Sequence, residues 1–348
     1  MRRQPASRRA KDAIRNISAA IYGLSGLYRV LHRGRAVLLA YHRVLPVEDL
    51  DESFIQPGMY VLDDVFEKQM RFLKNAFEIV PLADLLARWR TGAWDRRARY
   101  CAITFDDGWL DNYQHAYPIL RRYGIPATIF LPTAFIGTQA RFWWDELTRL
   151  LRRCWLTRQG ERPPDGLTRL LARYPWLAQL GAEPTGERLD WIVEKFKDVP
   201  EQEICEWLEA TRRALDWKVR EQRVLVNWQE VAEMSGCGIS FGSHSSTHRI
   251  LTRLSREEIR KELHDSFDSL RQRPIRSIPV FCYPNGDYNR DVVEEVQQAG
   301  YEAAVSGRFG LERGVPDDLW GLKRIGVHND VSRTPALLAL RMSGLAWA

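Results

Sequence analysis

The amino-acid sequence predicts an α/β protein whose strands form a barrel-like, parallel sheet. Short apolar runs alternate with amphipathic helical patterns along most of the 348 residues, as in stacked β-α units. Seven such strand–helix steps can be traced, which favours a barrel over an open doubly wound sheet. The composition, 45% hydrophobic and 28% charged, is that of a globular protein and not of a disordered or fibrous one.

The chain begins with a basic arm, residues 1–35. Apolar residues recur every three or four positions between residues 12 and 31, which predicts an amphipathic helix. The arm holds nine Arg and Lys residues against one Asp, a net +8. The whole chain carries +6, so the remainder carries −2. The basic character therefore gives no evidence that the folded body binds nucleic acid, and we expect no nucleic-acid partner.

Three interpretations of this arm stay open. A signal peptide would need a more apolar centre and a small-residue cleavage site, and a core-like strand follows directly at residues 36–41. A second interpretation is a helix packed on the body behind a basic tail. The third is a helix that lies on an anionic membrane surface, so that residues 1–35 make a peripheral membrane contact.

The predicted barrel occupies residues 36–137 and 227–335, and a short tail follows over 336–348. Its predicted strands are 36–41, 78–80, 100–105, 126–131, 238–241, 278–282 and 302–305. The predicted helices between them are 63–76, 82–90, 112–123, 256–273 and 291–299. Ser255, followed three residues later by Glu258, predicts a capping box at the start of one of these helices.

Residues 138–226 interrupt the strand–helix alternation. This stretch is rich in Trp, Arg and Leu at helical spacing and shows no clear strand, so it predicts a helical insertion between two barrel segments. Phe142, Trp143 and Trp144 lie near its start. Large aromatic residues most often anchor cores, but Trp143 and Trp144 are also candidate surfaces for stacking on sugar rings.

Two motifs carry the chemistry. Asp106 and Asp107 follow an apolar strand directly, and His244 and His248 stand four residues apart far downstream. Each pair alone has a common structural explanation, as a helix N-cap or as surface histidines. Both pairs, however, follow predicted strands of one parallel sheet, where functional groups collect at the carboxyl ends. Two His and one Asp suit a catalytic divalent metal, and the second Asp remains as a base, which predicts a hydrolase.

These residues resemble the motifs of the polysaccharide deacetylases, the carbohydrate esterase family with the NodB homology domain. Thr104-Phe105-Asp106-Asp107-Gly108 matches the first motif, and His244-Ser245-Ser246-Thr247-His248 matches the second. The resemblance covers roughly residues 36–330 without the insertion. It implies a distorted (β/α)7 barrel. It also implies metal-dependent removal of an N-acetyl group from an amino sugar, in a polysaccharide or lipid-linked saccharide of exopolysaccharide or cell-envelope biosynthesis.

The resemblance also implies roles for the matched residues. Asp107, His244 and His248 would bind the metal, and Asp106 would be the general base. A site of two His and one Asp suits zinc, while cobalt, nickel and iron are chemically admissible.

The third motif departs from the usual Arg-Pro-Pro of the family. The chain has Tyr283-Pro284-Asn285 there, so Tyr283 and Pro284 are candidate substrate contacts and the Asn285 amide is the candidate oxyanion donor. The missing arginine normally braces the base. Arg324 is the candidate replacement; the alternative is a surface arginine at a strand end.

The general acid has two candidates. Most family members carry it in a late Leu-x-x-His motif, to which His328 is a loose match. His42, in Ala40-Tyr41-His42, resembles the early Tyr-His segment of the poly-N-acetylglucosamine deacetylases. We favour His42 on its position; the structural alternative is a strand-end histidine bonded to backbone.

The five cysteines are scattered and form no Cys-x-x-Cys pair, which is typical of a reducing compartment. With no convincing export signal, we expect a cytoplasmic protein at the cytoplasmic face of the inner membrane that acts on a lipid-linked, N-acetylated sugar. Two alternatives stay open. One is a deformylase or other amide hydrolase on a lipid-linked sugar, and the other is an inactive carbohydrate-binding barrel.

Overall fold

The computed structural model describes residues 6–52, 55–56, 58–157, 172–174, 186–214 and 223–344. The chain divides into two compact units. The first comprises Met1–Leu45, Tyr60–Thr138 and Leu225–Ala348, and the second comprises Pro46–Met59 and Gln139–Val224. Within the described ranges, no helix has both the length and the apolar character that crossing a bilayer requires.

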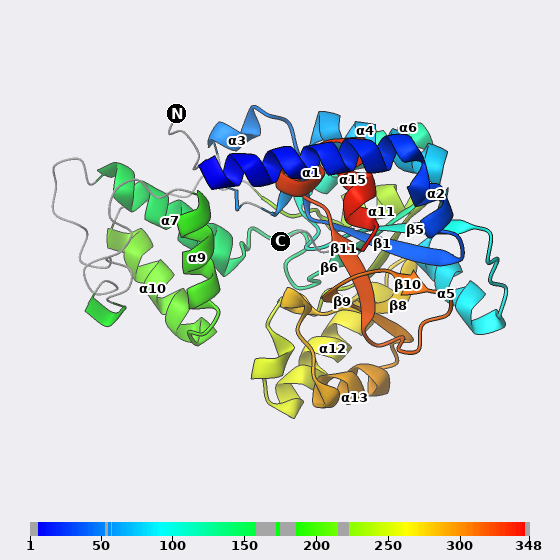
Figure 1. Ribbon diagram of the computed structural model, residues 1–348. Coiled ribbons are helices and arrows are strands. Elements are labelled where there is room, and N and C mark those ends of the chain that lie inside the picture. The colour runs from blue at the N-terminus through cyan, green and yellow to red at the C-terminus, as the bar shows by residue number, and fades with distance from the viewer. Residues whose placement is uncertain are drawn as a thin grey trace. The chain divides into compact units, whose positions relative to one another are not determined.

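Seven parallel strands close into a ring in the first unit (Figure 1). Around the ring they are β1 (Arg35–Tyr41), β11 (Leu322–Gly326), β9 (Ala303–Phe309), β8 (Ser277–Cys282), β7 (Ile239–Ser243), β6 (Ala127–Leu131) and β5 (Arg99–Phe105). β5 then pairs with β1 in parallel along all seven residues of each strand, which closes the ring. The predicted (β/α)7 barrel is therefore confirmed.

The predicted number of barrel strands is right, but one predicted strand lies outside the ring and one strand of the ring was not predicted. Residues 78–80 contribute β4 (Glu78–Ile79), which pairs with β5 from outside the ring. The true seventh strand is β11, which the search for apolar runs overlooked because Lys323 and Arg324 interrupt it. Two further strands, β2 (Arg43–Leu45) and β3 (Tyr60–Leu62), form a separate parallel pair, and β10 (Glu312–Arg313) joins β1 antiparallel.

Helices cover the ring on its outer side. They include α4 (Asp63–Ala76), α5 (Leu82–Thr91), α6 (Tyr117–Tyr123), α11 (Trp228–Gly236), α12 (Arg256–Arg271), α13 (Arg290–Gln298), α14 (Asn329–Ser332) and α15 (Pro335–Met342). A π-helical turn, Asn112–Ala116, opens the predicted 112–123 helix. The predicted capping box is confirmed, because the Glu258 amide donates to Ser255 and the Ser255 amide donates to the Glu258 carboxylate.

Side chains on the barrel strands alternate between the interior and the helical shell. Leu38, Ala102 and Val280 belong to the inner cluster, whereas their sequence neighbours Leu39 and Ile103 belong to the larger cluster beneath the helices. Strand side chains alternate with period two. The parity of a residue therefore decides whether it faces the interior, and this continues into the residues that follow each strand.

The N-terminal arm forms α1 (Ala6–Ser25) and α2 (Leu27–Leu31), joined at Gly26 with φ 64°. α1 packs against α15, as Figure 1 shows in blue and red. Ala19, Tyr22 and Tyr28 are buried on this side of the arm. The arm is therefore packed on the barrel unit through one of its faces.

The described regular elements of the second unit are all helices: α3 (Asp49–Glu52), α7 (Trp143–Thr157), α9 (Gly186–Phe196) and α10 (Glu201–Ala214). Trp143 and Trp144, the candidate sugar-stacking residues, are partly buried against the apolar cluster that α7, α9 and α10 share. Trp144 also stacks on the buried Phe142, with ring centroids 4.4 Å apart. Both tryptophans thus contribute to the packing of this unit.

His32, just after α2, is a buried histidine outside the catalytic motifs. It is 1% exposed and packs edge-on against Phe77, with ring centroids 5.3 Å apart. Neither ring nitrogen has a hydrogen-bond partner in the described part of the chain. Burial, with smaller contributions from Arg35 and Arg99, lowers the pKa of His32 to about 4.

We expect His32 to make folding stability depend on pH. Its pKa is lower in the folded chain than the ordinary ~6.5, so the unfolded chain binds the proton more readily. The stabilisation is complete above pH ~6.5 and is lost as pH falls to about 4, a change of about 3 kcal/mol. Denaturant titrations of the wild type and His32→Phe at pH 7, 5.5 and 4 would measure it. Loss of stability that is equally steep in His32→Phe would contradict the assignment; exposed His264→Gln is the control.

Candidate active site

The two aspartates of the first motif follow β5 in a tight turn. Phe105 faces the helical shell, so the parity of the strand turns Asp106 towards the barrel interior. The Asp106 amide donates to the Tyr41 carbonyl at 2.9 Å, which continues the β1–β5 pairing by one residue. Asp107 has φ 73° and Gly108 φ 66°, and a Cβ on Gly108 would lie 2.6 Å from Leu131 Cδ2. The turn therefore requires glycine at 108 and presents two adjacent buried carboxylates.

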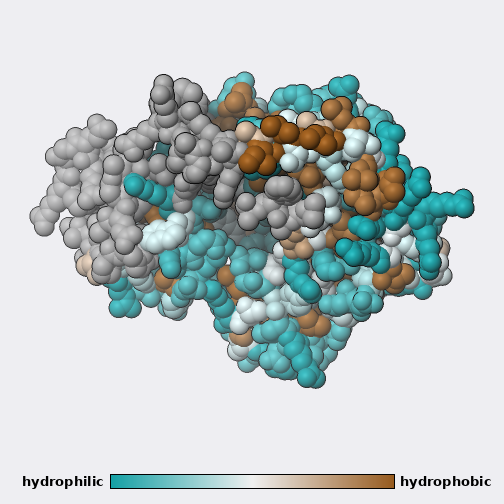
Figure 2. Space-filling model, in the orientation of Figure 1, coloured by the Kyte–Doolittle hydropathy of each residue, from teal (hydrophilic) through white to brown (hydrophobic). Residues whose placement is uncertain are grey.

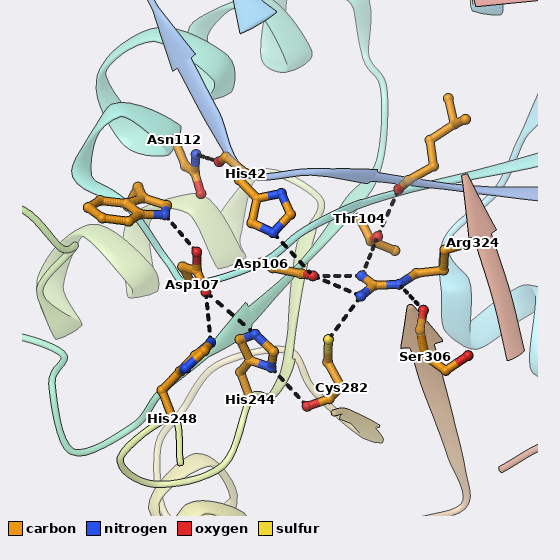
Figure 3. A network of polar contacts seen from close by, with 12 residues as sticks. His42, Thr104, Asp106, Asp107, Asn112, His244, His248, Cys282, Ser306 and Arg324 are labelled. Atoms are coloured by element: carbon orange, nitrogen blue, oxygen red, sulfur yellow. Dashed lines mark hydrogen bonds and ion pairs between the residues drawn. The ribbon is translucent and has the colours of Figure 1, made fainter. Parts of the chain in front are cut away.

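Asp107, His244 and His248 converge on one point (Figure 3). The Nε2 atom of His244 lies 3.5 Å from Asp107 Oδ1, and that of His248 lies 3.2 Å from the same oxygen. The two imidazole rings stand perpendicular, with centroids 4.5 Å apart. The structure thus brings together the three residues predicted to hold a metal.

Neighbouring groups fix the orientation of two of these side chains, His244 and Asp107. His244 Nδ1 lies 2.8 Å from the Cys282 carbonyl oxygen; donation to that acceptor leaves the lone pair on Nε2. The Trp109 indole donates to Asp107 Oδ2 at 2.8 Å and leaves Oδ1 towards the histidines. These two hydrogen bonds therefore direct His244 Nε2 and Asp107 Oδ1 towards the common point, where His248 Nε2 also lies.

The electrostatics of the cluster favour a positive charge beside Asp107. Burial opposes ionisation of Asp107, but hydrogen bonds from His244 and His248 outweigh it, so the pKa of Asp107 lies well below its ordinary value. Burial disfavours charged His244, yet Cys282 and the two aspartates raise the pKa of His244 well above its usual range. Burial and the neighbouring His244 lower the pKa of His248. A cation at this point would meet one carboxylate and two imidazoles.

The loop that carries His248 is held by Glu262, a residue that the sequence reasoning missed. One Glu262 oxygen accepts from the amides of Ser246 at 2.9 Å and Thr247 at 2.8 Å, and the other accepts from the Thr247 hydroxyl at 2.5 Å. Ser245 and His248 both have positive φ, 64° and 63°. The buried carboxylate thus stabilises a strained loop that its backbone alone would not favour.

We expect Glu262→Ala to weaken binding of a divalent cation by about 10- to 100-fold without removing a ligand. The substitution leaves two loop amides without their acceptor, so His248 is no longer held in place. Competition against a fluorescent chelator would measure the affinity for zinc. Glu257→Ala, at an exposed site on the same helix, is the matched control, and Glu262→Gln should recover much of the affinity because it keeps an acceptor. Unchanged affinity in Glu262→Ala would refute the role.

Asp106 forms a buried, two-pronged ion pair with Arg324 of β11. Arg324 Nη1 lies 2.6 Å from Asp106 Oδ1, and Nη2 lies 2.8 Å from Oδ2. The guanidinium also donates to the Ser306 carbonyl and the Thr104 hydroxyl, and contacts the Cys282 sulfur at 3.2 Å. Burial by itself would raise the pKa of Asp106, but Arg324 outweighs burial and keeps that pKa below its ordinary value. Asp106 is therefore an ionised carboxylate at neutral pH.

Of the two histidines considered as general acid, His42 is the one that lies beside Asp106. Its Nε2 atom lies 3.9 Å from Asp106 Oδ2, and its side chain is 27% exposed. The Asn112 side chain donates to the His42 carbonyl at 2.7 Å and fixes the backbone there. His328 follows β11, and its Nδ1 atom lies 3.5 Å from Asp330 Oδ2.

The third motif forms a turn at the end of β8. Asn285 is exposed with φ 60°, and its side chain donates to Asp287. Pro284 is buried. The Tyr283 ring is fully buried; it stacks on Tyr288, and its hydroxyl donates to the Trp320 carbonyl at 2.9 Å. This placement differs from the predicted substrate contact: Cys282 faces the barrel interior, so Tyr283 faces the helical shell.

Comparison with known proteins agrees with this site. The family model for polysaccharide deacetylases matches residues 94–157 and 202–304, which include the Asp pair and the His pair. These two stretches match a polysaccharide deacetylase domain.

Curated relatives of this deacetylase domain match over short stretches. A Staphylococcus aureus poly-β-1,6-N-acetyl-D-glucosamine N-deacetylase is 33% identical over 113 residues, which are 30% of this chain and 38% of the relative. YxkH of Bacillus subtilis is 63% identical over 35 residues, 10% of this chain and 12% of YxkH. The matches thus span well under half the length of these relatives.

Solved deacetylases share the fold over most of the chain. The Streptococcus pyogenes deacetylase PplD, in complex with acetate, superposes with a TM-score of 0.57 at 18% identity, over 88% of this chain and 98% of PplD. IcaB from Ammonifex degensii gives 0.55 at 15% identity, over 90% of this chain and 97% of IcaB. The barrel of the deacetylase domain is therefore the one found in these structures.

Proposed function

We propose that the chain hydrolyses the N-acetyl group of an amino sugar in a polysaccharide or lipid-linked saccharide, with the help of a divalent cation. The observation that carries the proposal is the placement of Asp106 beside the Asp107, His244 and His248 cluster. A relative named for N-deacetylation of poly-β-1,6-N-acetyl-D-glucosamine, and the acetate in the PplD structure, support this substrate class.

The residues at the cluster fit a divalent cation. One carboxylate oxygen and two imidazole nitrogens converge, and the bond from His244 to the Cys282 carbonyl presets the tautomer that a metal requires. Zinc suits this set best, while cobalt, nickel and iron can also bind imidazole and carboxylate ligands. When bound, such a cation polarises the amide carbonyl and lowers the pKa of a water molecule.

The surrounding residues supply the proton transfers. Asp106, kept ionised by Arg324, accepts the proton of the attacking water. His42, near Asp106 and partly exposed, donates a proton to the amine that leaves. The exposed turn at Asn285 offers a backbone amide for the developing oxyanion. The roles of Asp106 and His42 are inferred from their positions and charges, and that of the Asn285 amide from its place in an exposed turn.

The test is acetate release from β-1,6-linked N-acetylglucosamine oligomers by the full chain, after metal removal and after reloading with zinc. Release that requires zinc, and that disappears in His244→Ala together with the bound metal, would support the proposal. His42→Ala should lose most of the rate and keep the metal, whereas His328→Ala should keep both. Formate in place of acetate would assign a deformylase, and binding without release would assign a carbohydrate-binding barrel. No bound metal after zinc loading would refute the proposed chemistry.

We propose further that the substrate is lipid-linked and is met at the cytoplasmic face of the inner membrane. The support is that Cys101, Cys205, Cys237 and Cys282 form no disulfide and that two of them are exposed, as suits a reducing compartment. Reporter fusions at the C-terminus, active only on one side of the membrane, would test the location. Activity of a periplasmic reporter alone would reject it.

A further inference from the structure

The arm of helices α1 and α2 leaves one apolar face uncovered. Seven of the eleven exposed large hydrophobic side chains in the described part of the chain belong to this arm. They are Ile14, Ile17, Ile21, Leu24, Leu27, Val30 and Leu31. Ile14, Ile17 and Ile21 are each at least 58% exposed, and Leu24 is 91% exposed. Figure 2 shows the hydrophobic residues gathered along α1.

This face is distinct from the one that packs on the barrel unit. Ile14, Ile17, Ile21 and Leu24 are spaced by three, four and three residues, so they form one stripe along the helix. The buried residues, such as Ala19 and Tyr22, lie on roughly the opposite side at 100° per residue. The stripe is therefore not the face by which α1 packs on the barrel unit.

The charges of the arm are arranged around this stripe and not within it. Between residues 13 and 28 the single charged residue is Arg15, which donates to the Asp330 carbonyl at the packed side. Basic residues stand at both ends of the stripe. Arg29 and Arg33 are exposed after it, and Arg8, Arg9 and Lys11 precede it in the sequence. The whole arm carries a net +8.

We infer that α1 and α2 dock the chain on the surface of an anionic lipid bilayer, with the aliphatic stripe among the acyl chains and the basic ends at the lipid phosphates. An uncharged, wide apolar face with cationic ends is the pattern of a helix lying in the membrane interface. Each basic residue near an anionic surface strengthens binding further. Pairing of two such arms from two copies would instead bring two +8 segments together, which charge repulsion opposes.

The test is co-sedimentation of the full chain with vesicles of phosphatidylcholine alone and with 30% phosphatidylglycerol. We expect binding to the anionic vesicles, weakened by salt, and at least tenfold weaker binding for the double variant Ile17→Ser/Leu24→Ser. Both sites are exposed, so the variant should keep its melting temperature. The matched control is Val47→Ser/Val315→Ser, which removes two exposed aliphatic side chains elsewhere. Arg29→Gln/Arg33→Gln should reduce binding to anionic vesicles more than binding to neutral ones.

Two results would overturn the inference. One is vesicle binding that is absent, or that the Ile17/Leu24 pair does not change. The other is a dimer in sedimentation equilibrium that the same pair dissociates, which would assign the stripe to a second copy. The inference does not depend on the proposed reaction, because acetate release from soluble oligomers should be the same in the Ile17/Leu24 variant and the wild type.

Discussion

We expect Asp106→Asn to lower the rate of acetate release by about a thousandfold while the chain keeps its bound cation. Asparagine has the shape of aspartate but cannot accept the proton of the attacking water. The change leaves untouched the three residues that we propose hold the cation, Asp107, His244 and His248. Single-turnover rates with N-acetylglucosamine oligomers, beside metal content by mass spectrometry, would measure both effects.

The control must separate catalysis from stability, because Asp106→Asn also leaves the buried Arg324 guanidinium without a charge partner. Asp145→Asn makes the same change at another buried aspartate with arginine neighbours, Arg141 at 3.2 Å and Arg149 at 3.6 Å. It should cost stability and leave the rate unchanged. A rate in Asp106→Asn within tenfold of the wild type would remove Asp106 from the proposed chemistry.

We expect Arg324→Leu to lower the free energy of unfolding by about 3–5 kcal/mol, because it leaves a buried carboxylate uncompensated. Both guanidinium contacts to Asp106 are lost, together with those to Ser306 and Thr104. Arg324→Lys should recover only part of this, since an ammonium group cannot donate to both carboxylate oxygens in the same way. Denaturant titration at pH 7 would measure the change.

A double variant distinguishes a charge effect from lost packing. Asp106→Leu/Arg324→Leu removes both charges, and replacing a buried ion pair by apolar residues is often close to neutral. We therefore expect the double variant to be more stable than Arg324→Leu and to release no acetate. If the two single losses simply added in the double variant, the pair would contribute through packing and not through its charges.

The fold was largely predictable because apolar periodicity records which face of each element is buried. The helix predicted over 63–76 has these bounds in the structure, and the Asp and His motifs lie where their strands end. β11 was not predicted as a strand because its middle residue, Arg324, faces the barrel interior as an ion-pair partner. A charged residue at an interior position breaks the apolar pattern by which strands are recognised in a sequence. Tyr283 could have been placed correctly: it shares parity with Phe281, which packs beneath the helices.

Other features of the site had weaker signals or none. One indication of Glu262 was present in the sequence: its position places a carboxylate on the same face of a helix as the buried Ile259 and Leu263. The role of the Cys282 carbonyl, which orients His244, could not be predicted from the sequence, because every residue type has the same backbone carbonyl. Asn285 and the other residues with positive φ depend on turns that side-chain patterns do not determine.

The closure of the ring through β1 affects how the protein folds during its synthesis on the ribosome. β1 pairs with β5 near the start of the chain, but its other ring neighbour, β11, is synthesised almost 300 residues later. Arg324, the ion-pair partner of Asp106, is likewise synthesised 218 residues after it. Until β11 emerges, the nascent barrel has two open edges and an unneutralised interior carboxylate. Asp106 can therefore gain its charge partner only after nearly the whole chain has been translated, and we expect chaperones to bind a product that is truncated before β11.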